Sequence, residues 1–278
     1  MEKRQPYPTD LTEEQWNRVA TLIPAVKTGG RPARYGRREI VSAIFYQMRG
    51  GAAWRMLPHD MPPWRITYHY FRLWRSWERI HDRLRGDVRE AAGRERTPSA
   101  GCLDSQSVKT TDRGGVHGYD AGKKVNGRKR HVLVDTLGLV WLLAVTAASV
   151  QDRDGARTLL QVLANRMKRR RVIWADGGYA GALVDWVRSL RKRDKVRLDL
   201  VNRSAHGKGF QRLPHRWIVE RTFGWFNRWR RLSKDYEYLT ETSETTIRVV
   251  MIHLMTRRLA PVKRQAKRTR KQARMRAF

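Results

Sequence analysis

Apolar residues recur at helical spacing through the first third of the chain. A capping box of Thr12 and Gln15 begins the first predicted helix, which ends at Pro24. A second predicted helix ends at Gly50 and Gly51. A third is predicted from one apolar stripe that consists of Ile66, Tyr70, Leu73, Trp77 and Ile80. Because basic residues lie between the apolar rows, these helices indicate a helix-turn-helix-like DNA-binding unit.

The pattern changes to strands at Gly101, after a polar connection near residues 93–100. Strands are predicted at residues 101–108, 130–135, 139–145, 172–175 and 196–201. Helices are predicted near residues 154–169 and 181–192, and after the last strand. The order βββαβαβα predicts a mixed α/β sheet flanked by helices. It matches the ribonuclease-H-like order, in which the first and fourth strands are neighbours at the centre.

Three regions follow from these patterns. We expect a smaller, all-helical DNA-binding domain at residues 1–96 and a ribonuclease-H-like domain at residues 97–260. Residues 261–278 are rich in lysine and arginine and contain no acid, which is typical of a solvated tail that binds phosphates non-specifically.

A predicted helix near residues 214–236 carries an acid on its polar side. Its apolar stripe consists of Val219, Phe223 and Phe226. On the neighbouring face, Glu220 lies four residues after Arg216 and four before Gly224, where a missing side chain leaves room for a ligand. The alternative is an ordinary surface pair of Arg216 and Glu220, worth a few tenths of a kcal/mol.

The charge of the chain narrows the class of partner. Lysine and arginine total 59 against 26 aspartates and glutamates, a net charge of +33, and the commonest polyanionic partner is nucleic acid. A membrane surface is the competing partner, but no basic amphipathic anchor stands out. The longest apolar run, residues 139–150, is too short to cross a bilayer, and no secretory signal follows Met1. Cys102 is the single cysteine, so we expect a soluble cytoplasmic protein without disulfides or a zinc site.

Three carboxylates are candidates for one site. Asp104 lies on the first predicted strand, Asp176 at the carboxyl end of the fourth, and Glu220 on the helix expected to cover that end. Oxygen-only ligands favour Mg²⁺ or Mn²⁺, and two such ions roughly 3.5–4 Å apart promote phosphodiester displacement. Alternatively, Asp104 is a satisfied polar residue at a strand edge and Asp176 forms a turn before two glycines.

Four segments in this order resemble the bacterial insertion-sequence DDE transposases of family five. They are residues 102–109, the loop 114–131, residues 175–179 and residues 216–223. The resemblance extends from about Leu11 to Leu259 and includes residues 50–64. It implies a ribonuclease-H-like core that acts on DNA.

By this resemblance Asp104, Asp176 and Glu220 are the catalytic triad and the metal ligands. They would bind two Mg²⁺ ions, for which Mn²⁺ can substitute. The enzyme would hydrolyse the phosphodiester at each terminal inverted repeat and join the 3′ hydroxyls to target DNA. Related transposases carry a Tyr, Arg, Glu, Lys signature around the acid. Arg216 and Glu220 match its middle members, whereas Leu213 and Asn227 replace the outer two.

Basic residues near these motifs are expected to contact the DNA backbone. Arg216 suits bidentate binding of the phosphate next to the cleaved bond. Arg228 and Arg231 are candidates to replace the missing lysine. Lys123, Lys124 and Arg128 lie in a glycine-rich loop that is either a clamp on DNA or a mobile surface loop.

The partners expected are double-stranded DNA and a second copy of the chain, because transposition holds two ends together in a dimer or larger assembly. The expected location is the bacterial cytoplasm at the nucleoid. Two alternatives are a catalytically silent DNA-binding protein derived from a transposase and a ribonuclease-H-like nuclease that acts on branched nucleic acid.

Overall fold

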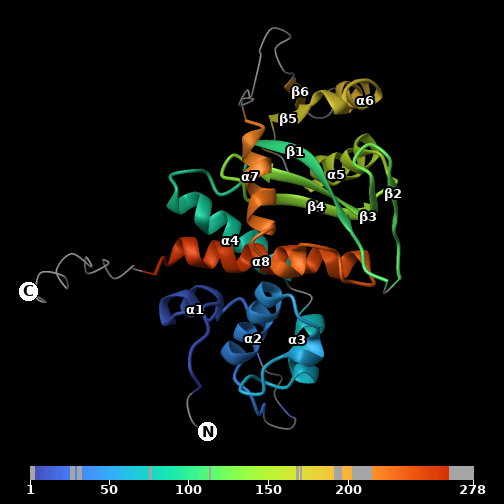
Figure 1. The fold of residues 1–278 in the computed structure, drawn as a ribbon. Coiled ribbons are helices and arrows are strands. Elements are labelled where there is room, and N and C mark those ends of the chain that lie inside the picture. The colour runs from blue at the N-terminus through green and yellow to red at the C-terminus, as the bar shows by residue number, and fades with distance from the viewer. Residues whose placement is uncertain are drawn as a thin grey trace, which may run out of the picture.

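The computed structural model describes residues 4–25, 29, 33–74, 77–112, 114–166, 169, 171–190, 196–201 and 215–262. Figure 1 shows a sheet and its helices on one side of the long helix α8 (Thr240–Leu259), with α1 (Glu13–Val19), α2 (Arg37–Gly50) and α3 (Trp64–Leu73) on the other. The predicted tail from residue 263 onward and Leu213 lie outside the described residues.

The sheet has the predicted ribonuclease-H-like order. Its strands are β1 (Ala100–Lys109), β2 (Gly118–Asp120), β3 (Val125–Asp135), β4 (Val140–Ala147), β5 (Val172–Asp176) and β6 (Arg197–Val201). Strands β1, β3 and β4 form an antiparallel unit, and β5 and β6 extend it in parallel from β1. The first and fourth predicted strands, β1 and β5, are therefore neighbours, as expected.

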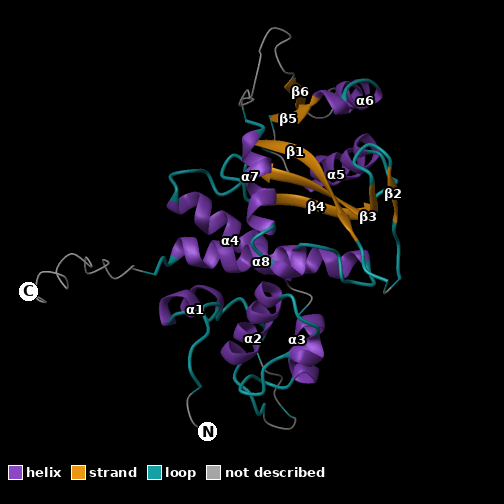
Figure 2. Cartoon of the chain, viewed as in Figure 1, coloured by secondary structure: helices purple, strands orange, loops and turns teal. Residues whose placement is uncertain are grey.

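Helices cover both faces of this sheet (Figure 2). On one face lie α5 (Asp152–Arg166) and α6 (Ala182–Leu190), whose apolar residues share a core with Leu103, Leu133 and Ile173 of the strands. On the other face lie α4 (Trp77–Ala91), α7 (Trp217–Phe226) and α8. The single-turn helices are η1 (Trp54–Met56), η2 (Gly177–Tyr179) and η3 (Arg230–Leu232).

Helix α8 joins the helical region to the sheet. It contacts α4, β4, α1 and α2, and one apolar core runs from Leu11 through Phe45 to Met255. Apolar residues are buried on several sides of α8, so the helix lacks the single apolar stripe that identifies a surface helix. For this reason the sequence pattern did not predict it.

Two further elements differ from the sequence-based prediction. The third predicted helix is two helices, because α3 ends at Leu73 and α4 begins at Trp77. The Trp77 indole donates a hydrogen bond to the Phe71 carbonyl (3.0 Å), which holds the chain at this break. The glycine-rich loop also contains a short strand, β2, paired with the start of β3.

Among the described helices, none combines the length and the apolar character needed to span a bilayer.

Candidate catalytic site

Strand pairing brings two of the three predicted acids together. In the parallel pair of β1 and β5, Gly101 lies opposite Ile173 and Cys102 opposite Trp174. The paired residues end there; continuing the register by two residues would place Asp104 opposite Asp176, and the Asp176 carboxylate acts electrostatically on Asp104. Neighbouring strands lie about 4.8 Å apart, and residues at equivalent positions point to the same face. The fold therefore holds these two carboxylates side by side where β5 ends.

The surroundings of Asp104 disfavour its charged form. The pKa of Asp104 is raised to about 6, chiefly by burial and in part by the nearby Asp176 carboxylate. The Ser105 backbone N–H, which donates to the Asp104 Oδ1 at 2.7 Å, acts in the opposite direction, as do the cations Arg216 and Lys123. A half-buried acid of this kind is stabilised as a carboxylate by any further cation beside it.

Asp176 ends β5 and caps the following turn. Its Oδ1 accepts a hydrogen bond from the backbone N–H of Gly178 at 2.9 Å, so it is the N-cap of η2. The turn-forming role considered from the sequence is therefore present. The other oxygen, Oδ2, lies 3.1 Å from a guanidinium nitrogen of Arg216. Asp176 thus holds the turn with one oxygen and faces the site with the other.

Helix α7 contributes the third acid and the arginine. Val219 and Phe226 are fully buried, which fixes the helix on the core as its stripe predicted. Glu220 is exposed, and its Oε1 lies 3.9 Å from the Arg216 Nε. A Cβ added at Gly224 would meet no atom within 4 Å, so the predicted open space beside Glu220 exists.

Arg216 therefore stands between the carboxylates. It pairs with Asp176 and Glu220, and its charge also acts on Asp104. Within the described residues, no three acids, histidines or cysteines come close enough together to hold a metal ion. The donors present are all carboxylate oxygens, the type that Mg²⁺ and Mn²⁺ prefer. Asp104 and Asp176 lie near each other and so suit a divalent ion. Glu220 is linked to Asp176 through Arg216, with which both acids pair.

A polar network beside Asp104 was not predicted. Lys123 donates from Nζ to the Ser105 hydroxyl (2.9 Å) and carbonyl (3.1 Å), and lies 3.8 Å from Asp152. Asp152 also pairs with Lys129 at 2.9 Å. Its position at the start of α5, which follows the β3–β4 hairpin, is the only signal that could have placed it here.

The six expected DNA contacts divide into buried and accessible residues. Arg128 is fully buried and pairs with Asp235 at 3.1 Å, and Arg231 is buried and pairs with Glu237 at 2.6 Å. In this structure both guanidinium groups are held in buried ion pairs, so a contact of Arg128 or Arg231 with DNA would require the side chain to leave its acid. The remaining four, Lys123, Lys124, Arg216 and Arg228, keep exposed or half-exposed side chains.

Comparison with known proteins places this site in a family. A model described as "Transposase DDE domain" matches residues 95–255, more than half of the chain, and this range includes all three acids. The chain belongs to the DDE transposase family. A second model, "Putative transposase of IS4/5 family", matches residues 11–84 of the transposase.

Individual relatives match shorter stretches. A protein of Burkholderia cepacia described as "Putative transposase for insertion sequence element IS402" is 30% identical over 118 residues, 40% of this chain and 54% of that protein. An uncharacterized protein, y4sN, of Sinorhizobium fredii is 27% identical over 81 residues, 29% of this chain and 65% of that protein. The transposase thus matches less than two thirds of either relative's length.

Two solved structures of Mos1 are weakly similar in fold. The match to the strand transfer complex covers 85% of this chain and 79% of the Mos1 chain, with 12% sequence identity and a TM-score of 0.28. The match to the paired end complex with Mn covers 88% of this chain and 84% of the Mos1 chain, with 10% sequence identity and a TM-score of 0.29.

Proposed function

We propose that this transposase cuts DNA at the terminal inverted repeats of an insertion sequence and joins the released 3′ hydroxyls to target DNA. The observation that carries the proposal is the juxtaposition of Asp104 and Asp176 on neighbouring strands, with Glu220 on the covering helix. Family membership supports the same reaction.

Asp104, Asp176 and Glu220 would hold two Mg²⁺ ions, or Mn²⁺ in their place. Such ions activate the attacking oxygen and stabilise the leaving oxygen. Arg216 binds the phosphate next to the scissile bond through its planar fork, which leaves the carboxylates free for the cations. Because Arg216 now pairs with Asp176, this role requires its side chain to turn from the acid to the DNA.

The helical region up to residue 96 is proposed to bind the terminal repeats. On α3, the exposed residues Arg65, His69 and Arg72 follow one another at helical spacing and form a polar face. A face of this type fits the major groove. Lys124, Arg228 and the basic tail from residue 261 would add contacts to the backbone, and two copies of the chain would hold the two ends in the bacterial nucleoid.

The test is incubation of the protein with its own element's terminal repeats, a target plasmid and Mg²⁺, followed by mapping of the products. We expect end cleavage and joining, and a loss of both steps of at least about 100-fold in Asp176→Asn, since even outer-shell partners of a metal contribute 10–100-fold. Binding of the ends should remain. Asp185→Asn is the matched control, because Asp185 is an exposed acid on α6 paired only with Arg188 among the described residues.

Each alternative gives a different result. Cutting without joining would identify a nuclease, and binding without either step would identify a silent DNA-binding protein. Joining that persists in Asp176→Asn would remove the triad assignment.

A further inference from the structure

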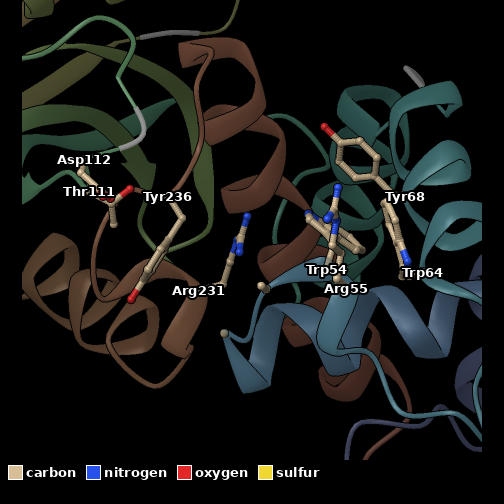
Figure 3. Close-up of a pocket in the computed structure, with 10 residues that line it drawn as sticks. Trp54, Arg55, Trp64, Tyr68, Thr111, Asp112, Arg231 and Tyr236 are labelled. Atoms are coloured by element: carbon tan, nitrogen blue, oxygen red, sulfur yellow. The ribbon is translucent and has the colours of Figure 1, made fainter.

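One cavity of the described structure lies away from the carboxylates. It measures about 690 Å³ and opens between the helical region and the end of the sheet (Figure 3). Trp54, Arg55, Trp64 and Tyr68 line one side, and Thr111, Asp112 and Tyr236 line the other. Thr111 follows β1, the strand that carries Asp104, so the cavity lies roughly 20 Å from the catalytic acids at about 3.3 Å per strand residue.

Arginine side chains lie against two of the aromatic rings that line this cavity. Trp64 has the guanidinium carbons of Arg55 and Arg65 at 5.5 and 5.6 Å from its ring centre. Arg72 lies 5.9 Å from the centre of the Tyr68 ring. Trp64 and Tyr68 are only half-buried, so their rings remain partly open to a ligand. Flat apolar surfaces bordered by exposed cations are typical of sites that stack bases and track a phosphate backbone.

Arg231 also lines the cavity, between its two sides, but it is paired with Glu237 at 2.6 Å. The exposed charges at the two sides distinguish the two ends of a nucleotide. Asp112 is exposed at one side, where its carboxylate repels a phosphate but accepts hydrogen bonds from the N–H groups of a base. Arg55 is exposed at the other side and suits a phosphate. A base lying toward Asp112 with its phosphate near Arg55 satisfies both groups.

We propose that this cavity receives one unpaired base of the DNA substrate. A separation of roughly 20 Å corresponds to about six base pairs of duplex at 3.4 Å each, which places the unpaired base within the same bound DNA end as the scissile phosphate. Trp64 and Tyr68 supply the stacking surface, and Asp112 contacts the edge of the base. This inference rests on the proposed function, because it requires a DNA substrate.

Two synthetic duplexes test it, one fully paired and one with a single unpaired 2-aminopurine. Binding is measured by fluorescence anisotropy at one fixed salt concentration, and stacking by quenching of the 2-aminopurine. We expect the wild-type protein to bind the duplex with the unpaired base about tenfold more tightly and to quench it, since stacking on an aromatic residue contributes at least about fivefold per base.

The variants separate this site from general DNA binding. Trp64→Ala should lose the preference and the quenching but bind the paired duplex within about twofold. Trp186→Ala is the matched control, because Trp186 on α6 also carries an arginine, Arg157, 5.1 Å from its ring centre but lies outside the cavity. Asp112→Ala, a change at an exposed position, should weaken binding of the unpaired base while leaving binding of the paired duplex equal or tighter.

A preference that persists in both Trp64→Ala and Asp112→Ala would overturn the base-binding site, and so would a wild-type protein that binds the two duplexes equally. Either result leaves the proposed transposase function standing, because paired DNA is still bound. A wild-type protein that binds neither duplex would overturn both proposals.

Discussion

Replacing Arg128 by methionine separates a structural role from a role in DNA binding. Arg128 lies on β3, and its guanidinium reaches the segment before α8. It donates to the carbonyl oxygens of Val116 (2.7 Å) and Tyr238 (2.6 Å), to the Ser243 hydroxyl (3.0 Å) and to Asp235 (3.1 Å). The side chains of Arg128 and Asp235 are both 0% exposed.

The expected loss follows from this burial. Methionine approximates the aliphatic part of arginine but removes the charge, so Asp235 is left as a buried carboxylate without its cation. Breaking a buried ion pair in this way costs about 3–5 kcal/mol of unfolding free energy. Because a whole domain is stable by only about 5–15 kcal/mol, the variant should unfold at a much lower urea concentration.

The assay compares stability with DNA affinity in two single variants. Arg128→Met should lose stability in urea but bind a paired duplex normally at a temperature where it is folded. Lys124→Met is the matched control, because Lys124 is also basic, lies just before β3 and is exposed. It should change stability by less than about 0.5 kcal/mol. If Lys124 contacts a phosphate, its loss should also lower the slope of log affinity against log salt by about 0.9.

A double variant tests the ion pair itself. Asp235→Leu combined with Arg128→Met should recover part of the lost stability, since an apolar pair leaves no unpaired buried charge. The reasoning would be refuted by an Arg128→Met protein that keeps its urea midpoint but loses DNA affinity. That result would mean that Arg128 leaves the interior to meet DNA.

Three further predictions concern α7, two buried histidines and the site arginine. Gly224→Ala should stabilise α7 by about 0.5–1 kcal/mol, measured in urea, yet reduce cleavage if DNA occupies the space beside Glu220. Burial lowers the pKa of His131 and of His253 to about 4, below the usual 6.5. The free energy of unfolding should therefore be highest above pH 6.5 and fall as the pH drops toward 4, by on the order of 1–3 kcal/mol for each histidine. Urea titrations at several pH values measure this fall, and His131→Gln and His253→Gln should flatten it. Arg216→Gln should bind Mn²⁺ more tightly, measured by calorimetry, because the substitution removes a cation that competes for the carboxylates. It should bind DNA more weakly, measured by anisotropy, because the proposed phosphate contact is lost. An unchanged Mn²⁺ affinity would contradict this.

Periodicity and strand order were sufficient to predict the sheet and the meeting of two acids. Strand β5 is short and apolar and ends at Asp176, so its parallel pairing with β1 follows once the strand order is known. The apolar stripe of α7 placed Val219 and Phe226 in the core and Glu220 on another face. These features are local, and each depends on a side-chain period that the sequence shows directly.

Features that depend on tertiary burial could not be predicted in this way. Arg128 and Arg231 are basic residues of the kind that contact DNA. Their acidic partners, Asp235 and Glu237, are known only from the structure, which places β3 and the segment before α8 together. The cavity lined by Trp64 and Tyr236 has the same origin, since these two residues come from distant parts of the chain. A sequence pattern reports the period of an element and gives no information on the element that will cover it.

Arg216 connects the resting site to the reaction. Asp104 and Asp176 repel each other, and half-burial makes the charged form of Asp104 costly, so the pair needs a cation whenever it is ionised. In the described structure Arg216 is that cation, and it also reaches Glu220. Divalent ions and the arginine therefore compete for the same oxygens, while a DNA phosphate competes with those oxygens for the arginine. Under the proposed function, ion binding and DNA binding favour each other, because each releases the partner that the other requires.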